Sequence, residues 1–115
     1  MREITSHKVN GLNEAIKIEA TGPGPGGAPL LYRIAYAEGQ HDIIFQNGNP
    51  AEGVNGISNE ALLAIVEDRL EGFQNGPFKC RENALALTKV QEAMHWLHHR
   101  TRQRVQRGIE GTLQK

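Results

Sequence analysis

The segment ENALALTKVQEAMHWLHHRTRQRVQRGIEGT, residues 82–112, decides the fold of this chain. Its apolar residues recur at spacings of three and four, the period of one face of an α-helix. Four of them form a single narrow stripe: Leu87, Val90, Met94 and Leu97. The pattern predicts a long helix whose stripe packs against another helix.

A basic segment, residues 98–107, follows the apolar stripe and contains no acidic residue. Arg100, Arg104 and Arg107 are spaced four and three, so they share one face of the predicted helix. We expect Arg100 and Arg104 to lack an acidic partner along the helix and to bind an anionic group. Guanidinium groups one turn apart suit this role because they form forked hydrogen bonds with phosphate oxygens. A solvated helix end without a ligand is the alternative.

A shorter helix is predicted upstream, beginning at Ser58, whose hydroxyl can cap the first turn. Five apolar residues give this helix an amphipathic pattern: Leu62, Ile65, Val66, Leu70 and Phe73. Asn75, Gly76 and Pro77 end it, because glycine favours the left-handed C-terminal cap and proline cannot continue a helix. The second helix then runs from about Lys79 to about Arg107, where the glycines of residues 107–112 end it.

The predicted second helix is about 42 Å long, at about 1.5 Å per residue. A compact domain of this size is only about 35 Å across, and the first helix spans only about 25 Å. Part of the apolar stripe is therefore left uncovered by the chain itself. A second copy of the chain is the most economical cover, so we expect a homo-oligomer.

The sequence of the first half of the chain predicts a small antiparallel sheet of three or four strands. Alternating or β-rich patterns predict these strands: residues 2–9, 14–20, 30–37 and 41–45. The glycine- and proline-rich residues 21–27 are expected to form a mobile hairpin loop without regular structure. The predicted fold is α+β, with a single domain over residues 1–115 that comprises a β-rich part (1–56) and a helical hairpin with its tail (57–112).

The composition excludes several classes of protein. The chain has 13 basic and 13 acidic residues, so it lacks the basic excess of a general DNA- or RNA-binding domain. Cys80 is the only cysteine, so no disulfide forms within the chain, and the cytoplasm is the expected compartment. No apolar run is long enough for a membrane span.

Catalytic and metal chemistry are weakly indicated. His95 and His99 are one turn apart, as in some zinc pairs, but no further ligand lies near them in the sequence. Surface or interface histidines are the favoured interpretation, and no metal or cofactor is expected. Because no nucleophile arrangement and no carboxylate pair is evident, we do not expect an enzyme.

The remaining pattern suggests a nucleotide-sized binding site. Phe73 and Phe78 flank the turn between the two helices and could stack on a nucleobase, while the arginines would bind phosphate. Two alternatives stay open: a small nucleic-acid-binding or regulatory module that uses the arginine helix, and a structural oligomerisation domain without a ligand.

Four segments of the helical half resemble the phage Thoeris anti-defence "sponge" proteins, which share their helical hairpin with the phage anti-CBASS sponges. The segments are ISNEALL (57–63), EGFQNGPF (71–78), RENALALT (81–88) and RTRQRVQRGIEGT (100–112). The resemblance implies non-catalytic capture of a bacterial second messenger, the glycocyclic ADP-ribose made by Thoeris TIR proteins. It places the protein in the cytoplasm of the infected bacterium.

The resemblance also implies roles for particular residues. Phe73 would stack on adenine, Asn83 would form a hydrogen bond, and Arg100 and Arg104 would bind the phosphates. A possible second site, for the cyclic di- and trinucleotides of CBASS, would use the tail residues Arg107, Gly108, Gly111 and Thr112. The assembly implied is a dimer or a hexamer built as a trimer of dimers.

Overall fold

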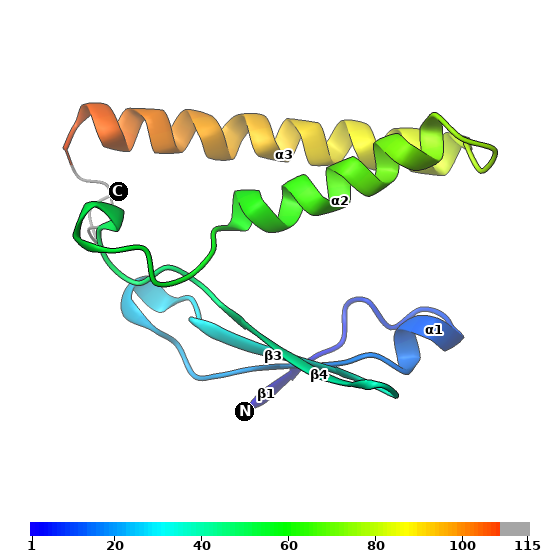
Figure 1. Ribbon diagram of the computed structural model, residues 1–115, viewed down its shortest axis with the longest axis horizontal. Helices are drawn as coiled ribbons and strands as arrows, with labels where there is room; N and C mark the ends of the chain where they lie inside the picture. The colour runs from blue at the N-terminus through cyan, green and yellow to red at the C-terminus, as the bar shows by residue number, and fades with distance from the viewer. Residues whose placement is uncertain (109–115) are drawn as a thin grey trace. The chain divides into compact units, whose positions relative to one another are not determined.

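The computed structural model describes residues 1–108, which form two compact units, residues 1–57 and residues 58–108 (Figure 1). The first unit is β-rich and the second is helical, so the predicted α+β class is confirmed. The number of independently folding domains stays a prediction.

The first unit is built on a four-stranded antiparallel sheet with the strand order β1-β2-β3-β4. Its strands are β1 (Arg2–Ile4), β2 (Lys17–Ala20), β3 (Leu31–Tyr36) and β4 (Gly39–Ile44). The predicted strand over residues 2–9 is much shorter, because the chain turns after Ile4, where Lys8 N–H donates to the Thr5 carbonyl at 2.9 Å. A short helix α1 (Gly11–Glu14) follows this turn. The side chain of Asn10 caps this helix by accepting a hydrogen bond from the backbone N–H of Asn13, at 3.0 Å.

The two faces of the sheet differ in polarity, as the alternating sequence predicts. One face carries apolar residues from all four strands: Ile4, Ile18, Ala20, Tyr32, Ile34 and Ile43. A row of charges crosses the other face: Glu3, Glu19, Arg33 and Asp42. Within this row Arg33 Nε donates to Asp42 Oδ1 at 2.9 Å, and this hydrogen bond lowers the pKa of the Asp42 carboxyl.

The loop of residues 21–27 connects β2 to β3 as a hairpin, as predicted. The expectation that it contains no regular structure is wrong, because Pro25–Gly27 form one 3-10 turn. Two glycines make the reversal possible: Gly26 has a φ of 82° and Gly27 a φ of 100°.

Residues 46–55 form a loop that is held by side-chain amides. Asn55 Oδ1 accepts from the backbone N–H of Asn47 at 2.8 Å, and Asn55 Nδ2 donates to the carbonyl of Asn47 at 2.8 Å. The loop returns the chain to the sheet, where Ile57 forms a parallel bridge with Phe45. The backbone at Gly56 therefore lies directly against the chain at Phe45 and Gln46.

The second unit is a hairpin of two helices that lie side by side, α2 (Asn59–Gln74) and α3 (Arg81–Gln106) (Figure 1). The predicted cap of α2 is confirmed, because Ser58 Oγ accepts from the backbone N–H of Ala61 at 3.1 Å. Helix α3 has 26 residues and is therefore about 39 Å long. No helix within residues 1–108 combines the length and the apolar content needed to cross a membrane.

The ends of the two helices differ in part from the prediction. Asn75, in a right-handed conformation, caps α2, so the expectation of a left-handed cap at Gly76 is wrong. Helix α3 begins two residues later than predicted, with Cys80 as its N-terminal cap. At the other end, Gly108 has a φ of 70°, which confirms that a left-handed glycine ends α3.

The apolar stripe of α3 is confirmed as its covered side, and this covered side continues beyond the stripe at both ends through polar residues. Covered or partly covered residues recur at spacings of three and four along the whole helix: Asn83, Leu87, Val90, Met94, Leu97, Thr101 and Arg104. On α2 the predicted amphipathic set is only partly right. Leu62 and Leu70 are partly covered, whereas Ile65 is 60% exposed and Val66 43%.

Candidate functional site

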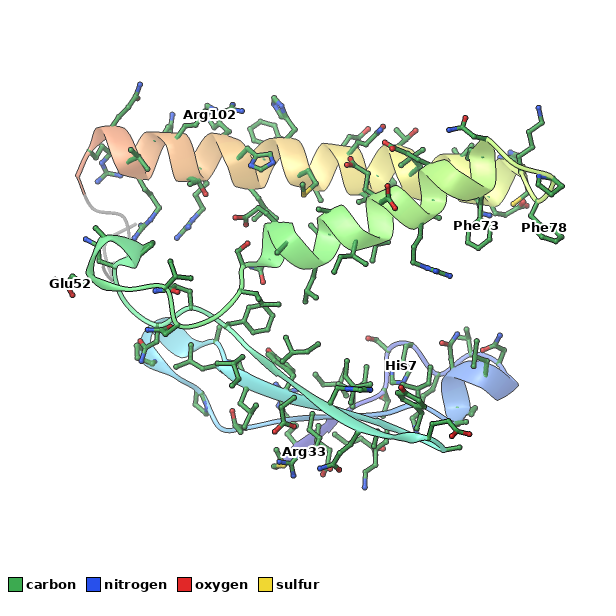
Figure 2. All side chains as sticks on the ribbon, viewed as in Figure 1. His7, Arg33, Glu52, Phe73, Phe78 and Arg102 are labelled. Carbon is green, nitrogen blue, oxygen red and sulfur yellow. The ribbon has the colours of Figure 1, made fainter. Side chains whose placement is uncertain are left out.

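The four residues predicted to bind a ligand lie on the helical hairpin, but at its opposite ends. Phe73 is in the last turn of α2 and Asn83 in the first turn of α3, whereas Arg100 and Arg104 are near the C-terminal end of α3. Figure 2 shows Phe73 and Phe78 at the turn and Arg102 near the far end of α3. Asn83 and Arg100 are about 25 Å apart along the helix axis, so one chain does not bring the four together.

The turn end of the hairpin presents two aromatic rings. Phe73 is 37% exposed and Phe78 is 72% exposed, so both rings have surface available for a ligand or a partner. The guanidinium of Arg69 lies over the Phe73 ring, with 5.6 Å between Cζ and the ring centroid. Arg69 is not among the predicted site residues, although its i, i+4 spacing from Phe73 indicates that the two side chains share a helix face.

Asn83 occupies the first position of the covered face of α3. Its backbone N–H donates to Cys80 Sγ at 3.4 Å, which fixes the start of the helix. Its side-chain amide is partly covered and has no hydrogen-bond partner within residues 1–108. Asn83 can therefore donate to and accept from a ligand at the turn end.

The two arginines at the other end differ in environment. Arg100 is exposed and forms no ion pair with any residue of the described range. Arg104 is only 6% exposed, and it already interacts with other groups of the protein. Arg104 is therefore not a free cation, while the expectation that it lacks an acidic partner along the helix stays a prediction. Arg104 continues the three-and-four spacing of the covered residues after Leu97 and Thr101, so it lies on the covered side of α3.

Two of the four residues predicted for the second site, Arg107 and Gly108, lie within the described residues. Arg107 is the C-terminal cap residue of α3 and interacts with other groups of the protein, and Gly108 follows it in the left-handed conformation. Gly111 and Thr112 lie outside the described residues.

His95 and His99 lie on either side of an exposed tryptophan. Trp96 is 67% exposed, and its ring centroid is 5.4 Å from that of His95 and 5.9 Å from that of His99, both in edge-on geometry. Residues 1–108 contain no group of three or more potential His, Cys, Asp or Glu metal ligands. These histidines form an aromatic cluster with Trp96 on α3.

A surface cavity of about 400 Å³ lies in the first unit, near the β2–β3 loop. It is lined by Met1, Arg2, Thr21, Gly22, Pro23, Gly27 and Pro29. None of the predicted ligand residues contributes to it. The candidate site on the hairpin is instead two separate surfaces, one aromatic and one basic.

Two comparisons with known proteins indicate the same family. The family model of the "Acb2/Tad1, hairpin domain" matches residues 38–102, more than half of the chain. The "Thoeris anti-defense 1" protein of Bacillus phage SBSphiJ7 is 44% identical over an alignment of 107 residues, which covers 79% of this chain and 75% of the relative. Both matches confirm the resemblance that the sequence motifs indicated, and the chain belongs to the phage Thoeris anti-defence family, whose shared element is the Acb2/Tad1 hairpin domain.

Proposed function

We propose that this phage protein sequesters a cyclic ADP-ribose isomer, glycocyclic ADP-ribose, in the cytoplasm of an infected bacterium. Binding this messenger would withhold it from the Thoeris effector. The proposal rests on the family membership together with two complementary surfaces of the hairpin. One surface presents the Phe73 ring and the side-chain amide of Asn83, and the other presents the exposed Arg100. The first suits a nucleobase and the second a phosphate.

The two surfaces would meet between two copies of the chain. A ligand of nucleotide size cannot bridge the roughly 25 Å between Asn83 and Arg100 on one helix. An antiparallel second copy would place its arginine end beside the turn end of the first. Two-fold symmetry then repeats the contact, which gives two equivalent sites in each dimer.

The roles of the residues in this composite site are those that the family resemblance implies, and the chemistry of each side chain suits its role. Phe73 stacks on adenine, Asn83 hydrogen-bonds the ligand, and Arg100 binds the pyrophosphate together with Arg104. Arg104, being buried, would act partly by supporting this end of α3. Because sequestration needs binding without turnover, no acid–base pair is required and the ligand leaves unchanged.

A larger assembly and a second ligand class belong to the same proposal. Three dimers would form a hexamer, and the tail from Arg107 would line a second site for the cyclic di- or trinucleotides of CBASS.

The function is tested by capture and release. The purified protein is incubated with glycocyclic ADP-ribose, separated from free ligand by filtration, and denatured by heat. We expect the nucleotide in the supernatant to be chemically intact in mass spectrometry. A converted nucleotide would indicate an enzyme, and no captured nucleotide would contradict sequestration.

The composite site requires self-association, which has its own test. Light scattering at micromolar concentration is expected to give at least twice the monomer mass of 12.7 kDa. Ile65→Glu, which places a charge on the exposed apolar side of α2, is expected to lower that mass, because a charge is costly in an interface. A wild-type protein that runs as a monomer would contradict the proposed site.

A further inference from the structure

Arg69 is a charged residue of the turn end that the family resemblance does not assign. Its guanidinium lies over the Phe73 ring, with 5.6 Å from Cζ to the ring centroid. The two residues are one turn apart on α2, so the helix itself maintains this contact. Arg69 is exposed, and it lies on the side of α2 that carries Val66 rather than on the side of Leu70.

The positive charge of Arg69 is not neutralised within residues 1–108. None of the ion pairs within residues 1–108 includes Arg69. Within this range, the side chain of Arg69 contacts the Phe73 ring. Its neighbours Asp68 and Glu71 project from other sides of the helix, since residues one or two apart do not face each other. The turn end therefore combines an aromatic surface with an available cation.

We propose that Arg69 is an additional ligand-binding residue, which contacts a phosphate of the nucleotide whose base stacks on Phe73. This inference rests on the proposed function, and it adds a positive charge to the turn end of the site. The Phe73 ring covers one side of the guanidinium and reduces its contact with water. A guanidinium that is partly dehydrated in this way forms stronger hydrogen bonds with a phosphate oxygen.

The geometry limits how the base can bind. A gap of 5.6 Å between Cζ and the ring centroid is too small to admit a base between guanidinium and ring, because each stacked layer needs about 3.5 Å. The base must therefore use the other side of the Phe73 ring. A phosphate of a compact cyclic nucleotide would then reach past the edge of the ring to the N–H groups of Arg69, which lie over its first side.

The test compares Arg69→Gln with the wild type by calorimetry, using glycocyclic ADP-ribose and the neutral nucleoside adenosine. Arg69→Gln loses a charge-assisted hydrogen bond to phosphate, so it is expected to bind the cyclic nucleotide about tenfold or more weakly than the wild type. Its affinity for adenosine, which has no phosphate, is expected to equal that of the wild type. Arg69→Lys is expected to restore part of the loss. Phe73→Leu is expected to weaken binding of both compounds, because both contain adenine.

Arg102→Gln is the matched control, since it removes the same charge from an exposed site on α3, far from the turn (Figure 2). It is expected to bind like the wild type. If Arg69→Gln binds the cyclic nucleotide as the wild type does, the role of Arg69 is overturned while the proposed function stands. If the wild type binds no cyclic nucleotide, the proposed function and the role of Arg69 are both overturned.

Discussion

Replacing Gly56 by alanine is expected to destabilise the β-rich unit by about 3 kcal/mol or more, a large part of the stability of a small domain. A Cβ at this position would overlap the carbonyl carbon of Phe45 and would lie 2.6 Å from the backbone nitrogen of Gln46. Both neighbours are backbone atoms, so no side chain can move aside. The chain could accept the methyl group only by separating residues 56–57 from β4.

That separation would break two hydrogen bonds that close the loop of residues 46–55. Gln46 N–H donates to the Ile57 carbonyl at 2.9 Å, and Ile57 N–H donates to the Ile44 carbonyl at 2.8 Å. Each is worth about 1 kcal/mol to the folded state, and their loss adds to the steric cost. Urea denaturation at one fixed protein concentration measures the change.

Gly72→Ala is the matched control for this experiment. Gly72 lies inside α2, and an added Cβ would meet no atom within 4 Å. Alanine there is expected to raise the free energy of unfolding by up to about 1 kcal/mol, because glycine is the poorer helix former. Equal midpoints for Gly56→Ala and the wild type would contradict the close approach at Gly56.

Arg100→Ala and Arg104→Ala are expected to separate ligand binding from stability. Removing the exposed Arg100 should leave the melting temperature of the free protein unchanged. It should weaken binding of glycocyclic ADP-ribose about a hundredfold, because a phosphate loses a forked, charge-assisted partner. The melting temperature with and without nucleotide measures both effects.

Arg104→Ala should also lower the melting temperature of the free protein. Arg104 is buried and interacts with other groups, so its removal leaves those groups without a partner, at a cost of about 1–3 kcal/mol. Arg102→Ala should change neither quantity. If Arg100→Ala lowers the ligand-free melting temperature and leaves the ligand-induced rise unchanged, Arg100 has a structural role and the phosphate site is wrong.

The features that the sequence alone determined are those set by contacts between residues close in the chain. Spacings of three and four predicted both helices, and Ser58 marked the start of α2 because its hydroxyl bonds a backbone N–H only three residues away. Alternation predicted which side chains share a sheet face along β2 and β3, although the start of the predicted strand over residues 14–20 is wrong, because Glu14 ends α1 and β2 begins only at Lys17. Within residues 1–108, the family motifs lie on the two helices or directly beside their ends.

Only the tertiary structure decided which side chains are covered and which groups meet. Arg104 carries a charge, so its residue type alone predicts an exposed side chain, but it lies on the covered face of α3 and is buried. Gly56 is one of several glycines in a loop, and only the pairing of Ile57 beside Phe45 makes its missing side chain essential. Likewise, local spacing placed Phe73 and Arg100 on helices, whereas the length of α3 separates them. Burial and distance depend on segments remote in the chain, which local periodicity does not record.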